Sequence, residues 1–101
     1  MKENLILTVD AGTGDCRVIA FSLDGTLRHI AKHEWIYEKE EENVFTFHAQ
    51  RCWDEILEML KETVSSLPDC KIAAITAASQ RDGMVFLDRQ EREVYCAPNM
   101  D

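Results

Sequence analysis

A glycine-rich segment near the N-terminus carries residue types that could hold a phosphate. It lies between two apolar runs, residues 5–9 and 18–21, and reads Asp-Ala-Gly-Thr-Gly-Asp-Cys-Arg from position 10 to position 17. Gly12 and Gly14 permit positive φ, and they let backbone N–H groups point into one concavity that fits phosphate oxygens. Thr13 adds a hydroxyl donor. The pattern predicts a phosphate-binding hairpin turn made by Gly12, Thr13 and Gly14.

Charged side chains flank this turn on both sides. Asp10 stands at the end of the first apolar run, where its carboxylate would face the same space. Mg²⁺ keeps most of its waters and needs only one or two acidic contacts beside nucleotide phosphates, so Asp10 is the candidate metal ligand. Arg17 is a candidate for contact with the phosphates or for local charge balance. An Asp-x-Gly turn is also ordinary turn chemistry, and that purely structural interpretation stays open.

A second polar cluster follows the apolar segment 72–78. It reads Ser-Gln-Arg-Asp-Gly from residue 79 to residue 83, and open α/β sheets bind ligands at such strand ends. A guanidinium donates hydrogen bonds and a carboxylate accepts them, so Arg81 and Asp82 together could hold the vicinal hydroxyls of a polyol. Gln80 is a candidate contact beside them. A surface ion pair is the alternative interpretation of the two charges.

Composition limits the classes of protein to which this chain can belong. Its 101 residues allow one modest domain, and the shares of 46% hydrophobic and 30% charged residues are typical of a globular protein. A net charge of -8 argues against nucleic acid or an anionic membrane as partner. The four cysteines form no C-x-x-C pair, which favours reduced thiols and a cytoplasmic location. No apolar run approaches the roughly 20 residues of a membrane span.

The N-terminal half predicts three strands. They cover residues 5–9, 17–22 and 27 to about 35, and the Asp24-Gly25 pair between the second and third is a strong hairpin signal. The acidic stretch 38–43 has no apolar periodicity and is predicted to be a solvated loop.

The C-terminal half predicts one helix and further strands. Apolar residues at helical spacing indicate an amphipathic helix from about 49 to 67, with Pro68 as its stop. Small and β-branched residues from 72 to 78 predict a central strand that is buried on both faces. Short strands are expected at 84–87 and 94–96.

The order of these elements predicts an α/β fold with a mixed sheet. Three antiparallel strands come first, and a crossover helix then leads to a central buried strand. This order resembles the ribonuclease H-like arrangement of the sugar kinase, Hsp70 and actin superfamily, the actin-like ATPase fold. The Asp-x-Gly-Thr-x-x-x-Arg motif that starts at Asp10 is similar to the N-terminus of the FGGY carbohydrate kinases.

Later motifs refine this resemblance. Glycerol kinases carry Asn-Gln-Arg-Glu at the place of residues 79–82, where Arg and Glu contact the polyol, whereas the Ser-Gly-Gln-Met-His segment of xylulokinases is absent. The Ser-x-Arg-acid-Gly segment and the Cys-Ala-x-x-x-Asp ending at Asp101 look closer to autoinducer-2 kinases. Two positions depart from the family pattern. His48 replaces an Asp at the expected helix start, and Asp15 puts a charge where small or hydroxyl residues are usual.

The resemblance implies ATP-dependent phosphorylation of a hydroxyl on a small sugar or polyol, with ATP and Mg²⁺ as cofactors. It assigns the metal to Asp10, the phosphates to Gly12, Thr13, Gly14 and Arg17, and the substrate to Gln80, Arg81, Asp82 and Asp101. In the family, the catalytic Asp and the adenosine site lie in later sequence. Residues 1–101 are therefore expected to be a truncated, partial N-terminal substrate-binding lobe without a second lobe, and to be inactive alone.

Three alternatives remain open beside the general hypothesis of a carbohydrate kinase. The first is an autoinducer-2 kinase specifically. The second is a non-catalytic fragment that acts as an association module. The third is a ribonuclease H-like nuclease, which the acidic charge disfavours. Apolar strands that would lack neighbours, residues 72–78 and 84–87, lead us to expect a homo-oligomer.

Overall fold

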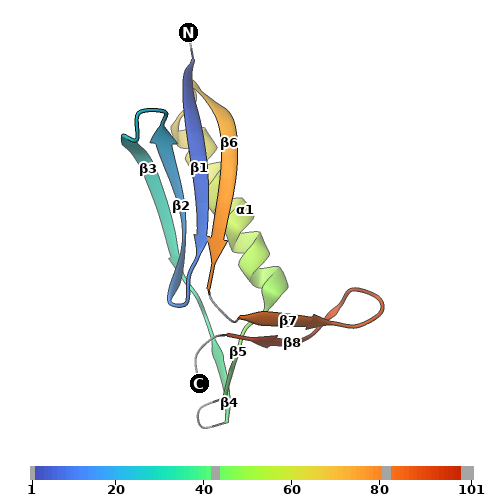
Figure 1. Cartoon of the computed structure of the whole chain (residues 1–101). Coiled ribbons are helices and arrows are strands. Elements are labelled where there is room, and N and C mark those ends of the chain that lie inside the picture. Colours follow the sequence, from blue (N-terminus) through green and yellow to red (C-terminus); the bar gives the residue numbers. More distant parts are fainter. Residues whose placement is uncertain (1, 42–43, 81–82, 99–101) are drawn as a thin grey trace.

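A mixed four-stranded sheet forms the body of the protein (Figure 1). The computed structural model describes residues 2–41, 44–80 and 83–98. The strands of the sheet, in the spatial order β3-β2-β1-β6, are β3 (Leu27–Glu34), β2 (Asp15–Ser22), β1 (Glu3–Ala11) and β6 (Cys70–Ser79). β2 runs antiparallel to both of its neighbours, β1 and β3, and β6 runs parallel to β1. The predicted fold class is confirmed.

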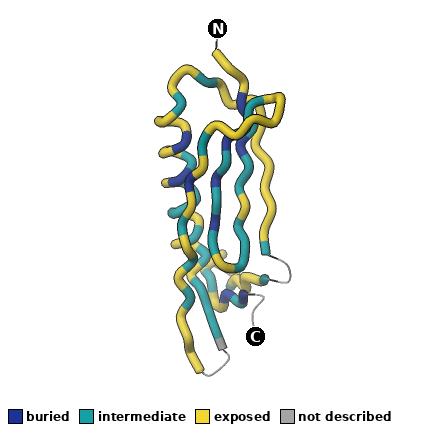
Figure 2. Tube along the Cα trace, turned by 90° about the vertical axis from the view of Figure 1, so that its left-hand side faces the viewer, coloured by how far each residue is buried: buried dark blue, intermediate teal, exposed yellow. Residues whose placement is uncertain are grey.

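Helix α1 (Ala49–Ser66) packs against one face of this sheet (Figure 1). Side chains alternate between the two faces of a strand, and the buried residues of β1 and β2 follow this alternation on the helix side, as Leu5, Leu7 and Val18 illustrate. Met59 and Thr63 are the buried residues of α1. Figure 2 shows the buried positions gathered along the inner strands and the facing side of the helix. This core fixes the strand ends from which the site is built.

Strand β6 departs from the sequence prediction in its environment. It was predicted to be central and buried on both faces, but it is an edge strand whose residues 71–79 are all exposed. In the described part of the chain it pairs only with β1, and α1 packs mainly against β2 and β3, so neither its outer edge nor its faces are covered. Ile75 is 57% exposed as a result.

The acidic stretch also departs from its prediction, because it forms a strand. β4 (Glu38–Glu41) pairs antiparallel with β5 (Val44–Thr46). All four side chains of β4 are exposed. Backbone ladder bonds hold such a hairpin without burial of an apolar face, so apolar periodicity gives no signal for it.

The last hairpin stands across the end of the sheet, beside the start of α1 (Figure 1). It consists of β7 (Met84–Leu87) and β8 (Glu93–Ala97), close to the predicted ranges. Glu93 caps the helix from this hairpin, since its Oε2 accepts the Gln50 N–H at 3.0 Å. His48, the residue at the N-cap, makes no side-chain capping bond. The capping bond that His48 does not make is thus supplied from β8.

His48 predicts a pH dependence of stability. Its Nε2 lies 3.0 Å from Glu38 Oε1 and its Nδ1 lies 3.3 Å from Glu93 Oε1. The hydrogen bond with Glu38, followed by that with Glu93, raises the pKa of His48 above its ordinary 6.5. A raised pKa means that the stabilisation by protonated His48 is complete below pH 6.5 and is lost as the pH rises through the raised value.

We therefore expect the thermal unfolding midpoint of the unmodified protein to fall over this window relative to that of His48→Gln. Circular dichroism melts of both proteins at a series of pH values would measure the difference. A constant difference between the two proteins across the window would contradict the role of His48.

Candidate functional site

The site is built at the carboxyl ends of β1 and β6. Residues 12–14 join β1 to β2 just beyond the last ladder pair, Ala11 with Cys16. Ala11 is also the partner of Ser79 in the parallel pairing of β1 with β6. The next residue, Gln80, donates its backbone N–H to Ala11 O at 2.8 Å. The structure thus brings together the glycine turn and the start of the second polar cluster, which the sequence predicted as separate motifs.

Asp10 occupies the position predicted for a metal ligand. It is the next-to-last residue of β1 and its side chain is exposed. Its Oδ1 lies 3.9 Å from the point where a Cβ on Gly12 would stand, so the carboxylate is beside the turn. Among the residues that the structure describes, no group of three His, Cys, Asp or Glu could hold a metal ion. A single open carboxylate suits Mg²⁺, which retains its waters, better than it suits a dehydrated metal.

The two glycines of the turn differ in how closely other atoms approach them. Neither uses positive φ, contrary to the sequence-based expectation, and Gly25 is the one described glycine that does. Gly12 permits a close approach instead, because a Cβ there would lie 3.3 Å from the backbone oxygen of Asp15. Around Gly14, nothing lies within 4 Å of the equivalent point.

This difference predicts unequal effects of alanine at the two positions. Gly12→Ala should lower the free energy of unfolding by about 1 kcal/mol, because backbone on the far side of the turn must move. Gly14→Ala, the matched control, should change it by less than about 0.5 kcal/mol. Urea unfolding of the two variants would measure both values. Equal losses would show that the close approach at Gly12 has no cost.

The carbonyl groups of the turn are held by the segment that follows β3. Trp35 Nε1–H donates to Gly12 O at 2.7 Å, and the Trp35 backbone N–H donates to Gly14 O at 3.2 Å. The Tyr37 hydroxyl donates to Thr13 O. Within the described ranges, the amides of Gly12 and Gly14 donate to no protein acceptor. Such amides can bind an anion, whereas a fully paired turn could not.

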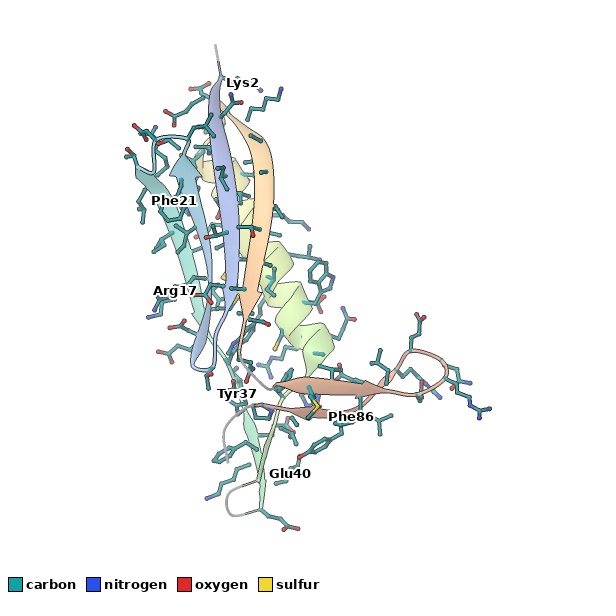
Figure 3. All side chains as sticks on the ribbon, in the orientation of Figure 1. Lys2, Arg17, Phe21, Tyr37, Glu40 and Phe86 are labelled. Atoms are coloured by element: carbon teal, nitrogen blue, oxygen red, sulfur yellow. The ribbon has the colours of Figure 1, made fainter. Side chains whose placement is uncertain are left out.

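Trp35 and Tyr37 were not identified as site residues from the sequence. The available signal was the placement of two aromatic residues at alternate positions at the end of a predicted strand. Figure 3 shows Tyr37 at the end of the sheet, near the start of β7.

Arg17 and Lys32 neutralise the unusual Asp15. Arg17 Nε lies 3.3 Å from Asp15 Oδ1, and Lys32 Nζ lies 3.3 Å from Oδ2. Desolvation acts to raise the pKa of Asp15, but the hydrogen bonds from Arg17 and Lys32 outweigh it and the pKa is lowered. Asp15 is therefore ionised and paired, and the contact that Arg17 makes is one of local charge balance.

A cavity of about 250 Å³ opens beside the turn. Its lining includes the aromatic side chains of Trp35, Tyr37 and Phe47, together with Gln80 and Val85. Gln80 is the predicted substrate contact that the structure places there. The other three, Arg81, Asp82 and Asp101, lie outside the described residues.

The thiols near the cavity are not activated nucleophiles. All four cysteines are unpaired. Burial raises the pKa of Cys16 and of Cys52, which lines the cavity, to about 11, so both stay protonated at neutral pH.

No helix in the described ranges is both long and apolar enough to cross a membrane.

Comparison with known proteins agrees with the motifs. Residues 5–98 match the FGGY family of carbohydrate kinases, N-terminal domain. YoaC of Bacillus subtilis (strain 168), which is provisionally named as a sugar kinase, is 28% identical over 102 residues that cover 99% of this chain and 21% of YoaC. The autoinducer-2 kinase of Yersinia enterocolitica is 26% identical over 100 residues, with coverage of 95% and 19%.

The fold agrees as well. The crystal structure of gluconate kinase from Lactobacillus acidophilus matches with a TM-score of 0.87 at 16% identity, over 95% of this chain and 20% of that one. The chain spans about a fifth of the length of the curated relatives that it matches. The predicted family is confirmed: the chain belongs to the FGGY family of carbohydrate kinases, and it matches their N-terminal domain.

Proposed function

We propose that this protein takes part in the transfer of a phosphoryl group from ATP to a hydroxyl of a small sugar or polyol. One observation carries the proposal. Asp10 and the turn at Gly12, with amides that are open to an anion, lie at the same end of the sheet as the cavity that Gln80 lines. A phosphate site and a small-molecule site side by side are what such a transfer requires.

Each residue of the turn has a task in this proposal. Asp10 would hold hydrated Mg²⁺, and the amides of Gly12 and Gly14 with the Thr13 hydroxyl would donate to phosphate oxygens. When bound, Mg²⁺ supplies a positive charge that stabilises the transferring phosphoryl group. Preorganised donors of this kind give most of the rate enhancement in phosphoryl transfer.

The substrate would be held by the second polar cluster. We assign the hydroxyl contacts to Gln80, Arg81, Asp82 and Asp101, and the stacking surface to Trp35. The autoinducer-2 molecule is the more specific candidate substrate, because several of the curated relatives are autoinducer-2 kinases at 25–26% identity.

We also propose that residues 1–101 act as part of the N-terminal lobe of a longer kinase, in the cytoplasm. The coverage of 19–21% of the relatives' lengths supports this assignment. In that case the catalytic base and the adenosine site lie in other sequence, and the 101-residue chain alone should form no ADP in response to sugars.

A coupled assay of ADP formation tests the proposed function. The longer protein would be supplied with ATP, Mg²⁺ and a panel of glycerol, xylulose, gluconate and the autoinducer-2 precursor. We expect ADP formation that depends on one member of the panel. ADP formation that none of them stimulates, together with an absence of phosphorylated product, would contradict the proposal.

We propose that the isolated chain associates with other copies of itself. The uncovered edge of β6 and the exposed strand β7 are the surfaces that support it. Light scattering should give a dimer or a larger species at micromolar concentration, and a monomer would contradict it.

A further inference from the structure

The segment between β3 and β4 contacts both the phosphate turn and the cavity. Trp35 and Tyr37 donate hydrogen bonds to the three consecutive carbonyls of Gly12, Thr13 and Gly14. The same two side chains line the cavity beside Gln80. The turn and the cavity therefore share one wall, and the inference drawn here rests on the proposed function.

Both aromatic rings are fixed by packing. Trp35 packs against a buried cluster that contains Cys16, Val18, Ala31 and Met59. The ring of Tyr37 meets that of Phe47 edge to face, with centroids 6.3 Å apart and planes at 86°. Rings that are anchored in this way hold their hydrogen-bonding partners in a fixed position, which exposed side chains would not do.

The Tyr37 hydroxyl lies between the two halves of the site. It donates to Thr13 O, and the side chain of Gln80, which lines the same cavity as Tyr37, is its polar neighbour on the other side. Burial raises the pKa of Tyr37, and the bond with Gln80 acts in the opposite direction. The hydroxyl thus keeps its proton at neutral pH and remains a donor to the turn.

Gly83 allows Gln80 to take this position. A Cβ on Gly83 would lie 2.8 Å from Gln80 Cγ and 3.0 Å from its Cδ, closer than carbon atoms can approach. Any side chain at residue 83 would displace the amide that contacts Tyr37.

We propose that Trp35 and Tyr37 are positioning residues for the phosphate turn, and that the Tyr37 hydroxyl couples the turn to the sugar cavity through Gln80. The carbonyl and the N–H of one peptide unit point in opposite directions, so holding Thr13 O on the side of the aromatic segment aims the amide of Gly14 away from it. A sugar that displaces the Gln80 side chain would then change the conformation of the turn through the Tyr37 hydroxyl. Such coupling changes the binding of sugar and nucleotide reciprocally.

Hydrogen exchange measured by NMR tests the bridge without any assay of activity. The readout is the backbone amide proton of Trp35, which is donated to Gly14 O. Tyr37→Phe removes only the hydroxyl, and we expect this proton to exchange about three- to tenfold faster, the effect of one lost hydrogen bond. Tyr95→Phe is the matched control, because the ring of Tyr95 on β8 pairs with Phe86 and does not line the cavity, and it should leave the rate unchanged.

A double-mutant cycle tests the coupling. Gln80→Ala keeps the backbone bond to Ala11 and should accelerate exchange of the Trp35 amide about twofold. The double variant should exchange no faster than Tyr37→Phe alone, because Gln80 acts through that hydroxyl. An unchanged rate in Tyr37→Phe would overturn the positioning role, and effects that simply multiply in the double variant would overturn the coupling.

The kinetic consequence separates this inference from the proposed function. In the longer kinase, saturating sugar should lower the KM for ATP about fivefold or more, and in Tyr37→Phe this factor should fall to about one while the KM for sugar changes little. An unmodified protein that phosphorylates no sugar would refute the function, yet the exchange cycle would still decide the positioning role. A Tyr37→Phe enzyme that keeps the full factor would refute the coupling alone.

Discussion

Asp10→Asn is expected to lower the rate of sugar-dependent ADP formation by about 100-fold or more, the usual cost of removing one group that stabilises charge in the transition state. The substitution keeps the shape of the side chain and removes its charge. Because Asp10 is exposed at the end of β1, folding should be unaffected. The measurement is kcat in the longer kinase that we propose, together with the affinity for Mg²⁺-nucleotide.

The control for Asp10→Asn is Asp69→Asn. Asp69 is also an exposed aspartate, and its backbone oxygen accepts the Glu3 N–H at the opposite end of β1 from the turn. Both variants change the net charge by the same amount, so a difference in kcat or in nucleotide affinity between them reports the position of the removed charge. If Asp10→Asn binds Mg²⁺-nucleotide as tightly as Asp69→Asn does, Asp10 is not the metal ligand.

Met59→Ala should have the largest effect on stability. Met59 has no exposed surface, and it packs against Cys16, Val18 and Ala31 at the interface of α1 with the sheet. Truncation leaves a cavity and should lower the free energy of unfolding by about 2–5 kcal/mol. A domain of this size has roughly 5–15 kcal/mol in total, so a large part of its stability would be lost. Urea unfolding followed by circular dichroism measures the change.

Val64→Ala is the comparison for the same helix. Val64 is 49% exposed, and alanine has the higher helix propensity. We expect a change below about 0.5 kcal/mol in either direction. Similar losses in both variants would mean that α1 does not pack on the sheet through the face that contains Met59.

Elements with a local signal could be predicted from the sequence. The apolar runs in β1 and β2 and the helical spacing of apolar residues in α1 predict two strands and a helix, and the structure confirms all three elements. The Asp24-Gly25 turn is confirmed as well, since Gly25 adopts a φ of 88°. A single residue type was enough there because few other residues accept that conformation.

The environment of β6 and the pairing of β4 could not be predicted in the same way. The apolar composition of β6 indicates a strand, but whether it is covered depends on the neighbours that surround it. β4 carries only charged side chains and is formed by backbone pairing with β5. Neither property is contained in the local order of apolar and polar residues.

The site shows the same division. Asp10 and the glycine turn could be proposed from the sequence because their residues are contiguous in it. Trp35 and Tyr37 were missed because they reach the turn through the return of β3 along β2, as the bonds to Gly12 and Thr13 show. The resemblance to known kinases suggested which residues would bind the phosphates, the metal and the substrate. It did not suggest which residues hydrogen-bond to the turn from outside it.

The parallel pairing of β1 with β6 has a consequence for the order of folding. Antiparallel β1 and β2 can pair as soon as the short turn between them closes. Ala11 of β1 pairs with Ser79 of β6 much later, because β3, the β4–β5 hairpin and α1 lie between these strands in the sequence. Closing so long a loop is slow, because entropy is lost before the contacts are gained. The glycine turn thus forms early as a bare hairpin, and Gln80, at the end of β6, reaches it late. During synthesis on the ribosome, ligand recognition must wait until residue 80 has emerged.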